Sequence, residues 1–273
     1  VSSGCMANYK SALKFWHGVE NAEWGKKQSN YPSEISDPLT VYMASYKRDM
    51  VKKKKHGVVP MKEGKDAFSF PGYEEICSLM MGMEPDGHSY RWSESIFGNL
   101  YLRLQFHTMG RTNNISSLLL AHISWDGDAM TITFCGTKGD LVGESTMEEK
   151  HIYPSPHMPH LCVHLATALY VWCKHIEEPE VGQLFEGSNQ IKRFDGILMD
   201  IVKKLVDKGI DVGAPLSDLS GHSLRKLSDS YVATLPGGPG SAAAARRAGH
   251  SSGKINDAYQ RETKLGDCAV GRC

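Results

Sequence analysis

The sequence predicts a mainly α protein that carries one small three-stranded antiparallel sheet (an α+β arrangement). Two observations support this fold class. Apolar residues recur at helical spacing through most of the chain, and only 121–140 and 150–156 have the pattern of short strands. The strand segment 121–140 also contains an Asp-Gly pair, which is a typical hairpin signal.

The N-terminal part is expected to form two helices. Apolar residues at helical spacing predict the first over 3–24. The second is expected over 36–57, with Asp37 as its N-cap, Pro38 in its first turn and Gly57 at its end. Turn-forming residues follow directly. We therefore expect a partial helical domain at 1–58, a linker at 59–65 and a second, larger domain at 66–273.

The larger domain is expected to alternate helices with the small sheet. A helix over 93–114 runs up to Arg111, and a hairpin over 121–140 and a strand within 150–156 follow, so that Lys138 falls in or beside the turn between the second and third strands. Apolar side chains in 73–83 are expected in the core. Further helices are predicted at 160–176, at 191–209, at 220–235 with Ser220 as N-cap, and after a Gly/Pro break at 236–240.

Composition excludes several classes. No apolar run approaches the roughly 18 residues of a membrane span, and the N-terminus lacks the pattern of a signal peptide. Seven cysteines without framework spacing indicate free thiols in a reducing compartment. The sequence begins without Met inside a predicted helix, which we expect of a fragment. A net charge of +0 argues against a uniformly basic nucleic-acid binder, although a basic face remains possible.

His222 and Arg225 form a His-x-x-Arg motif near the N-terminus of a predicted helix, where free N–H groups and the helix dipole favour anions. The motif alone is weak, because His88 and Arg91 form a second copy that we interpret as accidental. The groups that accompany the first copy along the chain distinguish it. They are Arg111, Lys138, His222, Arg225, His250 and Tyr259, in that order.

In this order and context the chain resembles the tyrosine recombinase superfamily, whose active site contains Arg, Lys, His-x-x-Arg, His or Trp, and Tyr. The resemblance covers roughly residues 66–261, and the segments "GHSLRKLSDSYVATL" and "RRAGHSSGKINDAY" look most like recombinases of Crypton-type eukaryotic mobile elements. It implies that 66–273 is a catalytic domain and that 1–58 is part of a helical DNA-clamp domain. It also implies site-specific cleavage and rejoining of double-stranded DNA, for integration or excision of a mobile element. It also implies a nuclear location in a eukaryotic cell, and otherwise a cytoplasmic one.

The six residues suit phosphodiester chemistry. A tyrosine hydroxyl has an ordinary pKa near 10, so its ionisation at pH 7 costs roughly 4 kcal/mol. Two guanidiniums, Arg111 and Arg225, would stabilise the charge that builds on the phosphate oxygens. Lys138 would protonate the leaving 5′ oxygen, His222 would assist proton transfer or orient the phosphate, and His250 would hydrogen-bond a phosphate oxygen. Tyr259 would form a 3′-phosphotyrosyl link, without a metal, nucleotide or other cofactor.

The resemblance further implies a homo-oligomer on DNA, with four protomers holding two duplexes and a monomer or dimer when free. Basic residues in both domains are expected to contact the DNA backbone, and binding should weaken steeply with salt. These residues are Lys47, Arg48, Lys52, Lys53, Lys54, Lys55, Lys226, Arg246 and Arg247. For the lysine run at 52–55, the simpler interpretations are a solvated helix end or a nuclear address.

Asn114 departs from the family pattern. Many relatives carry a carboxylate three residues after the first Arg, where it supports the guanidinium, whereas Asn brings no charge. Two alternatives therefore stay open beside the recombinase: a type IB topoisomerase, with the same chemistry on single duplexes, and a domesticated DNA-binding protein that does not cut.

A histidine-rich stretch raises zinc binding as a rival chemistry. It contains zinc-ligand types without a paired C-x-x-C and without the Glu of H-E-x-x-H, so no metal site is predicted and Cys162 is expected to pack as a small apolar residue. The residues considered are His151, His157, His160, Cys162, His164, Cys173 and His175.

Overall fold

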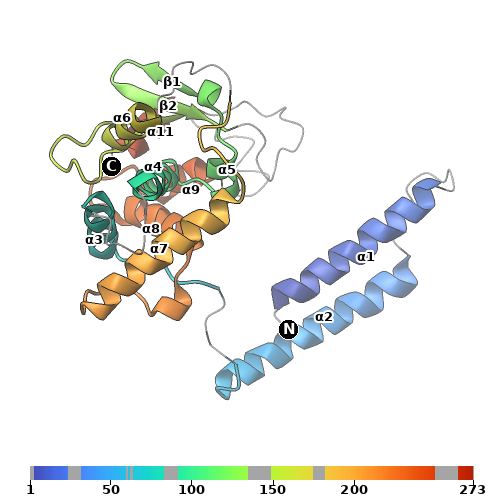
Figure 1. Ribbon diagram of the computed structural model, residues 1–273. Helices are drawn as coiled ribbons and strands as arrows, with labels where there is room; N and C mark the ends of the chain where they lie inside the picture. Colours follow the sequence, from blue (N-terminus) through green and yellow to red (C-terminus); the bar gives the residue numbers. More distant parts are fainter. Residues whose placement is uncertain are drawn as a thin grey trace. The chain divides into compact units, whose positions relative to one another are not determined.

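The chain divides into two compact units, Val1–Gly64 and Lys65–Cys273, with the division inside the expected linker. A computed structural model provides the structure (Figure 1). It describes residues 3–23, 32–59, 61, 64–82, 92–134, 149–174, 182–249 and 264–272.

The first unit contains two packed helices, α1 (Ser3–Glu23) and α2 (Ser33–Lys55). Lys10 of α1 donates a hydrogen bond from Nζ to Thr40 Oγ1 of α2 across 2.9 Å. The predicted end of α2 is confirmed. Gly57 has φ +69°, and the N–H groups of Gly57 and Val58 donate to the carbonyl oxygens of Lys54 and Lys53, which satisfies the last turn of the helix.

The predicted start of α2 is wrong. The helix begins at Ser33 after Pro32, whose carbonyl oxygen accepts hydrogen bonds from the N–H groups of Ile35 and Ser36. Pro38 therefore lies inside the helix rather than in its first turn. Proline cannot donate the bond to the carbonyl four residues earlier, but the surrounding turns form nonetheless, because a single missing bond is tolerated near a helix end.

The second unit is built around α4 (Trp92–Thr108), which lies in the middle of it (Figure 1). Nearly every residue of this helix is buried, on all of its faces, as expected of a helix surrounded by others. It packs against α3 (Phe70–Met81), α6 (Val163–Lys174), α7 (Gln190–Asp207) and α8 (Gly221–Thr234).

Apolar residues of these helices form one continuous core. In α7, Phe194, Ile197, Ile201 and Leu205 recur at helical spacing and are all buried. The Tyr101 and Phe194 rings stack with their centroids 4.2 Å apart, which joins α4 to α7. The prediction that 73–83 contributes to the core is confirmed in α3, where the buried side chains are Tyr73, Ile76, Cys77 and Met80.

The sheet has the order β1-β2-β3, with both neighbouring pairs antiparallel. Its strands are β1 (Ile123–Asp126), β2 (Ala129–Thr133) and β3 (Glu149–Ile152). The hairpin turns at Gly127, with φ +63°, between the paired residues Asp126 and Ala129. The predicted fold class, mainly α with a three-stranded antiparallel sheet, is confirmed.

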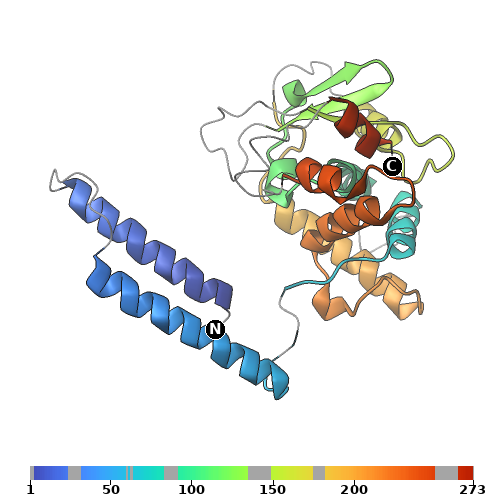
Figure 2. The ribbon, with the colours of Figure 1, turned by 180° about the vertical axis from the view of Figure 1, so that it is seen from behind.

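Short elements complete the second unit. They include α5 (Thr112–Ser116), the 3-10 helices η1 (Leu120–His122) and η2 (Leu216–Asp218), α9 (Gly240–Arg247) and α11 (Lys264–Gly271). Figure 2 shows α11 beside α9 and the sheet, and α11 packs against both β3 and α9. A second apolar cluster joins the C-terminal ends of α4 and α8 to α9 and α11. Its buried residues are Met109, Val232, Ala244, Ala248 and Val270.

None of the helices in the described parts of the chain is long and apolar enough to cross a membrane. Five cysteines fall within those parts, and all five are free thiols.

Candidate active site

The structure brings together Arg111, His222 and Arg225, three of the six predicted active-site residues, from two separate elements. Arg111 precedes α5, whereas His222 and Arg225 lie in the first turns of α8. Lys138, His250 and Tyr259 lie outside the described residues, and so do His88 and Arg91.

A tight turn at the end of α4 presents Arg111. Met109 has φ +52°, a left-handed conformation that is uncommon for a residue with a side chain. At Gly110, an added Cβ would lie 2.7 Å from Thr108 Oγ1 and 2.8 Å from Ile115 Cδ1, so a larger residue would require both side chains to shift. The backbone enters α5 directly afterwards, with Arg111 as the residue before the helix.

Arg225 connects this turn to the end of α9. Its Nη1 donates to the Met109 carbonyl oxygen across 2.7 Å, and its Nη2 donates to the Ala248 carbonyl oxygen. The side chain is 6% exposed. A guanidinium has five N–H groups, so three remain for another acceptor after these two bonds.

Arg111 approaches the same segment, because its Nη2 lies 3.5 Å from the Gly249 carbonyl oxygen. Gly249 immediately precedes His250 in the chain. The two arginines therefore converge on the backbone at 248–249, from the end of α4 and from α8.

Positive charge is concentrated at this point. Burial, and next the nearby positive charge of Arg111, lower the pKa of Arg225 to about 10, although Asp229 opposes these effects in part. At neutral pH Arg225 is still a cation. Two neighbouring guanidiniums repel each other, so the arrangement favours an anion that can lie between them.

His222 experiences the same positive field. Burial lowers its pKa, and the charges of Arg225, Lys226 and Arg111 lower it in addition. The imidazole is therefore neutral at neutral pH, which leaves one ring nitrogen able to accept a proton. The side chain lies at the surface, where a substrate can reach it.

The support of Arg111 by Asn114 is confined to the backbone. The Asn114 N–H donates to the Arg111 carbonyl oxygen across 2.9 Å, within the first turn of α5. Among the described residues, no side-chain hydrogen bond joins Asn114 to the Arg111 guanidinium. The orientation of Arg111 depends instead on the turn and on Gly249.

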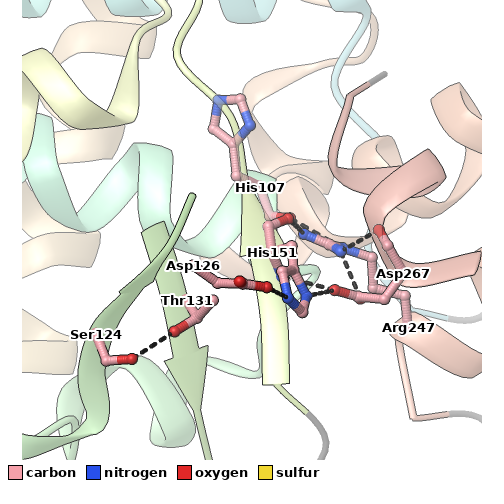
Figure 3. Close-up of polar contacts among 7 residues, drawn as sticks. All are labelled: His107, Ser124, Asp126, Thr131, His151, Arg247 and Asp267. Atoms are coloured by element: carbon pink, nitrogen blue, oxygen red, sulfur yellow. Dashed lines mark hydrogen bonds and ion pairs between the residues drawn. The ribbon is translucent and has the colours of Figure 1, made fainter. Parts of the chain in front are cut away.

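The prediction that Arg247 contacts DNA is wrong. Its side chain is 0% exposed and forms a buried ion pair with Asp267 of α11, with 2.5 Å between Nη1 and Oδ1. Nη2 also donates to the carbonyl oxygens of His107 and His151, across 3.0 Å and 2.8 Å. All of these partners lie inside the unit (Figure 3), so this guanidinium cannot reach a DNA phosphate.

The ion pair belongs to a larger buried network (Figure 3). Asp267 Oδ2 accepts hydrogen bonds from the His151 backbone N–H at 2.6 Å and from His151 Nδ1 at 2.9 Å. His151 Nε2 lies 3.2 Å from Asp126 Oδ2 of β1. The network therefore fastens α11 to α9 and to the sheet. Sequence analysis considered His151 only as a zinc ligand and did not detect Asp267.

The other basic residues predicted to contact DNA are at least partly accessible. Lys226 is exposed, although its Nζ donates to the Lys65 carbonyl oxygen, and Arg246 is half-buried. In the first unit, Lys53 forms an exposed ion pair with Asp49 at 2.8 Å, and Lys54 is half-buried. Exposed side chains elsewhere on α2 are Lys47, Arg48, Lys52 and Lys55.

The histidine-rich stretch does not converge on one point. Within the described residues, which exclude His175, no three His, Cys, Asp or Glu side chains form a group suited to a metal ion. His164 lies beside Trp125, with ring centroids 5.3 Å apart, and Cys162 is buried.

Comparison with known proteins gives structural similarity only. No family model matches the chain, and no curated protein sequence matches it. Among solved structures, the chain is similar to the XerH site-specific recombinase in a post-cleavage complex with its palindromic difH substrate. The identity is 13%, the TM-score is 0.49, and the alignment covers 75% of this chain and 52% of XerH.

Two further structures are similar at comparable levels. The FLP recombinase in a Holliday junction complex has 10% identity and a TM-score of 0.47, over 88% of this chain and 58% of FLP. The Tn1549 transposon integrase in complex with circular intermediate DNA has 12% identity and a TM-score of 0.46, over 96% of this chain and 84% of that structure. The chain thus spans about half the length of XerH.

Proposed function

We propose that this chain is a tyrosine recombinase that cuts and rejoins double-stranded DNA through Tyr259. The observation that supports this most strongly is the convergence of Arg111 and Arg225 on the end of α9, beside His222. Arg111 is far from the other two residues in the sequence, yet its positive charge acts on both His222 and Arg225. A site with two guanidiniums and a neutral imidazole suits a phosphodiester in which negative charge develops.

Each residue has a separate part in the proposed reaction. Arg111 and Arg225 stabilise the non-bridging oxygens, and His222 accepts the Tyr259 proton or orients the phosphate, because its lowered pKa keeps it neutral. His250 donates to a phosphate oxygen, and Lys138 protonates the leaving 5′ oxygen. Tyr259 then carries the 3′ phosphate in a covalent link that conserves the bond energy for rejoining.

The biological setting of the proposal follows from the sequence resemblance. We propose integration or excision of a Crypton-type mobile element in the nucleus, with four protomers on two paired duplexes. Recombinant products from paired sites would support this setting, whereas relaxation of supercoils without recombination would support the topoisomerase alternative.

Covalent trapping tests the chemistry. The protein is incubated with junction DNA that carries a nick near the cleavage site, so that the cut strand is lost and cannot be rejoined. EDTA is present throughout, and Tyr259→Phe is the matched control. A protein–DNA adduct that survives denaturant, forms in EDTA and disappears in Tyr259→Phe is the expected result.

Failure has a defined meaning in this assay. If DNA binds, as shown by a gel shift, and no adduct forms over long incubation, the proposed chemistry is wrong and the non-cutting interpretation gains support. An adduct that persists in Tyr259→Phe would show that a different nucleophile attacks the phosphate.

A further inference from the structure

We propose that Gln105 is a positioning residue that sets the distance between the two arginines of the site, an inference that rests on the proposed function. Gln105 lies in α4 and is fully buried. Its Nε2 donates to the Gly221 carbonyl oxygen across 2.9 Å and to Thr112 Oγ1 across 3.3 Å. Thr112 follows Arg111 in the chain, and Gly221 precedes His222.

The orientation of the amide follows from its partners. A carbonyl oxygen only accepts hydrogen bonds, so the NH₂ group of Gln105 must face Gly221. Both N–H groups are then used to join α5 to α8. Gln105 is therefore a bridge from the central helix to both halves of the site.

The elements on either side of this bridge are also held. Tyr101, one turn earlier in α4, donates from its hydroxyl to the Thr112 carbonyl oxygen across 2.8 Å. At Gly221, an added Cβ would lie 2.5 Å from Asp195 Oδ1 of α7, so α8 begins in close contact with α7. Gln105 therefore acts between two anchored segments and fixes their separation.

The amide also has a cost that packing alone does not explain. Gln105 Oε1 is buried and has no hydrogen-bond partner among the residues that the structure describes. A buried acceptor without a partner destabilises a protein, and an apolar side chain of similar shape would avoid this penalty. A residue that is unfavourable for stability but connects functional segments is expected where precise placement matters for function.

Gln105→Met tests the proposal, because Met has a similar length and cannot donate. The rate of adduct formation is measured at saturating nicked DNA, and the affinity for DNA is measured separately. We expect the rate to fall about 10- to 100-fold, since small displacements of catalytic groups have effects of this size. The DNA affinity and the thermal midpoint should change little, because other contacts supply binding and the buried unpaired oxygen is removed.

Gln190→Met is the matched control. Gln190 is also a buried glutamine whose Nε2 donates to two acceptors, the carbonyl oxygens of Phe185 and Gly187 at 3.0 Å and 2.5 Å, but it lies at the start of α7. We expect it to cleave at the wild-type rate. Equal loss of rate in both variants, or wild-type cleavage by Gln105→Met, would overturn the inference.

Gln105→Glu adds a pH readout that a purely structural role would not produce. Its buried carboxyl has a raised pKa and, when protonated, can donate to the Gly221 carbonyl oxygen; when ionised it cannot. The rate relative to wild type should therefore rise as the pH falls from about 8.5 to about 5.5. The titratable groups bordering this point are Tyr101, Asp195 and His222, and the ratio to wild type removes their shared contribution. If the cleavage rate of Gln105→Glu relative to wild type does not change with pH, the proposal that Gln105 bridges the two segments is contradicted.

A binding measurement separates this inference from the proposed function. Inorganic phosphate is titrated into wild type, Gln105→Met and Gln190→Met, and the His222 ring is followed by NMR after assignment with His222→Gln. We expect about 10-fold weaker phosphate binding in Gln105→Met only. If wild type forms no adduct on bound DNA, the proposed function fails, and this titration still decides the inference: equal phosphate affinity in all three proteins overturns it.

Discussion

Arg247 and Asp267 form an ion pair in the interior of the second unit, with 2.5 Å between Arg247 Nη1 and Asp267 Oδ1. The pair connects the end of α9 to α11, on either side of the segment 248–266. Both side chains are almost completely buried, so neither charge has water to replace a lost partner.

Asp267→Asn is therefore expected to destabilise the second unit by about 3–5 kcal/mol, because it leaves a buried guanidinium without its counter-charge. Urea unfolding followed by circular dichroism measures the change. The control is Asp128→Asn, which removes an exposed ion pair with Arg272 at 3.9 Å. That change should cost less than about 1 kcal/mol. Similar losses in both variants would show that the buried network does not stabilise the fold.

His107 gives the second unit a pH-dependent stability. Burial lowers its pKa to about 4, and its Nε2 contacts the Leu161 carbonyl oxygen at 3.1 Å. The unfolded chain therefore binds the proton more readily, and stability falls as the pH drops from about 6.5 towards about 4. The loss should approach about 3 kcal/mol at the lower end.

His107→Gln keeps a side-chain N–H for Leu161 but does not titrate in this range. The free energy of unfolding, measured between about pH 7 and about pH 4, should decline less steeply for this variant than for wild type. Parallel curves for the two proteins would mean that other groups, such as His222, cause the acid sensitivity.

Arg225→Lys should reduce adduct formation about 10²- to 10³-fold, the usual effect of removing one donor to developing charge. A lysine ammonium cannot reproduce the planar fork that donates to Met109 and Ala248 while keeping N–H groups for phosphate. Single-turnover cleavage at saturating DNA measures the loss. The control is Arg193→Lys, at a half-buried arginine of α7 whose Nε pairs with Glu94 at 2.7 Å, and it should stay near the wild-type rate. A similar loss there would point to a general disturbance of the fold.

DNA affinity should depend steeply on salt if the basic side chains of α2 contact phosphates. The double variant Lys52→Gln/Lys55→Gln is expected to reduce the slope of log affinity against log salt by about 2, since each phosphate contact contributes about 0.9. Fluorescence anisotropy between about 50 and about 200 mM salt measures the slope. Lys10→Gln in α1, whose ammonium bonds Thr40, is the control and should leave it unchanged. An unchanged slope of log affinity against log salt in the double variant would show that these lysines of α2 do not contact DNA phosphates.

Local patterns in the sequence determined most of the secondary structure. Helical periodicity predicted α1, α6, α7 and α8 close to their observed ranges, and the Asp-Gly pair predicted the β1–β2 turn. These features depend on neighbouring residues, so a linear sequence contains the information. The helix expected over 93–114 ends instead at Thr108, because the chain turns at Met109 and Gly110 before α5. The start of α2 was misplaced, because proline is tolerated in the second turn of a helix as well as in the first. The position of Pro38 therefore did not mark where the helix begins.

The order of chemically suitable residues also identified Arg111, His222 and Arg225 as partners, but only the tertiary structure shows that both arginines reach the backbone of 248–249. It alone decides which basic residues are available. Arg246 and Arg247 are adjacent and chemically identical, yet the helical turn points Arg247 into the interior, where Asp267 and His151 surround it. Gln105 carries no sequence signal at all, because a buried amide is defined by the distant groups that it joins.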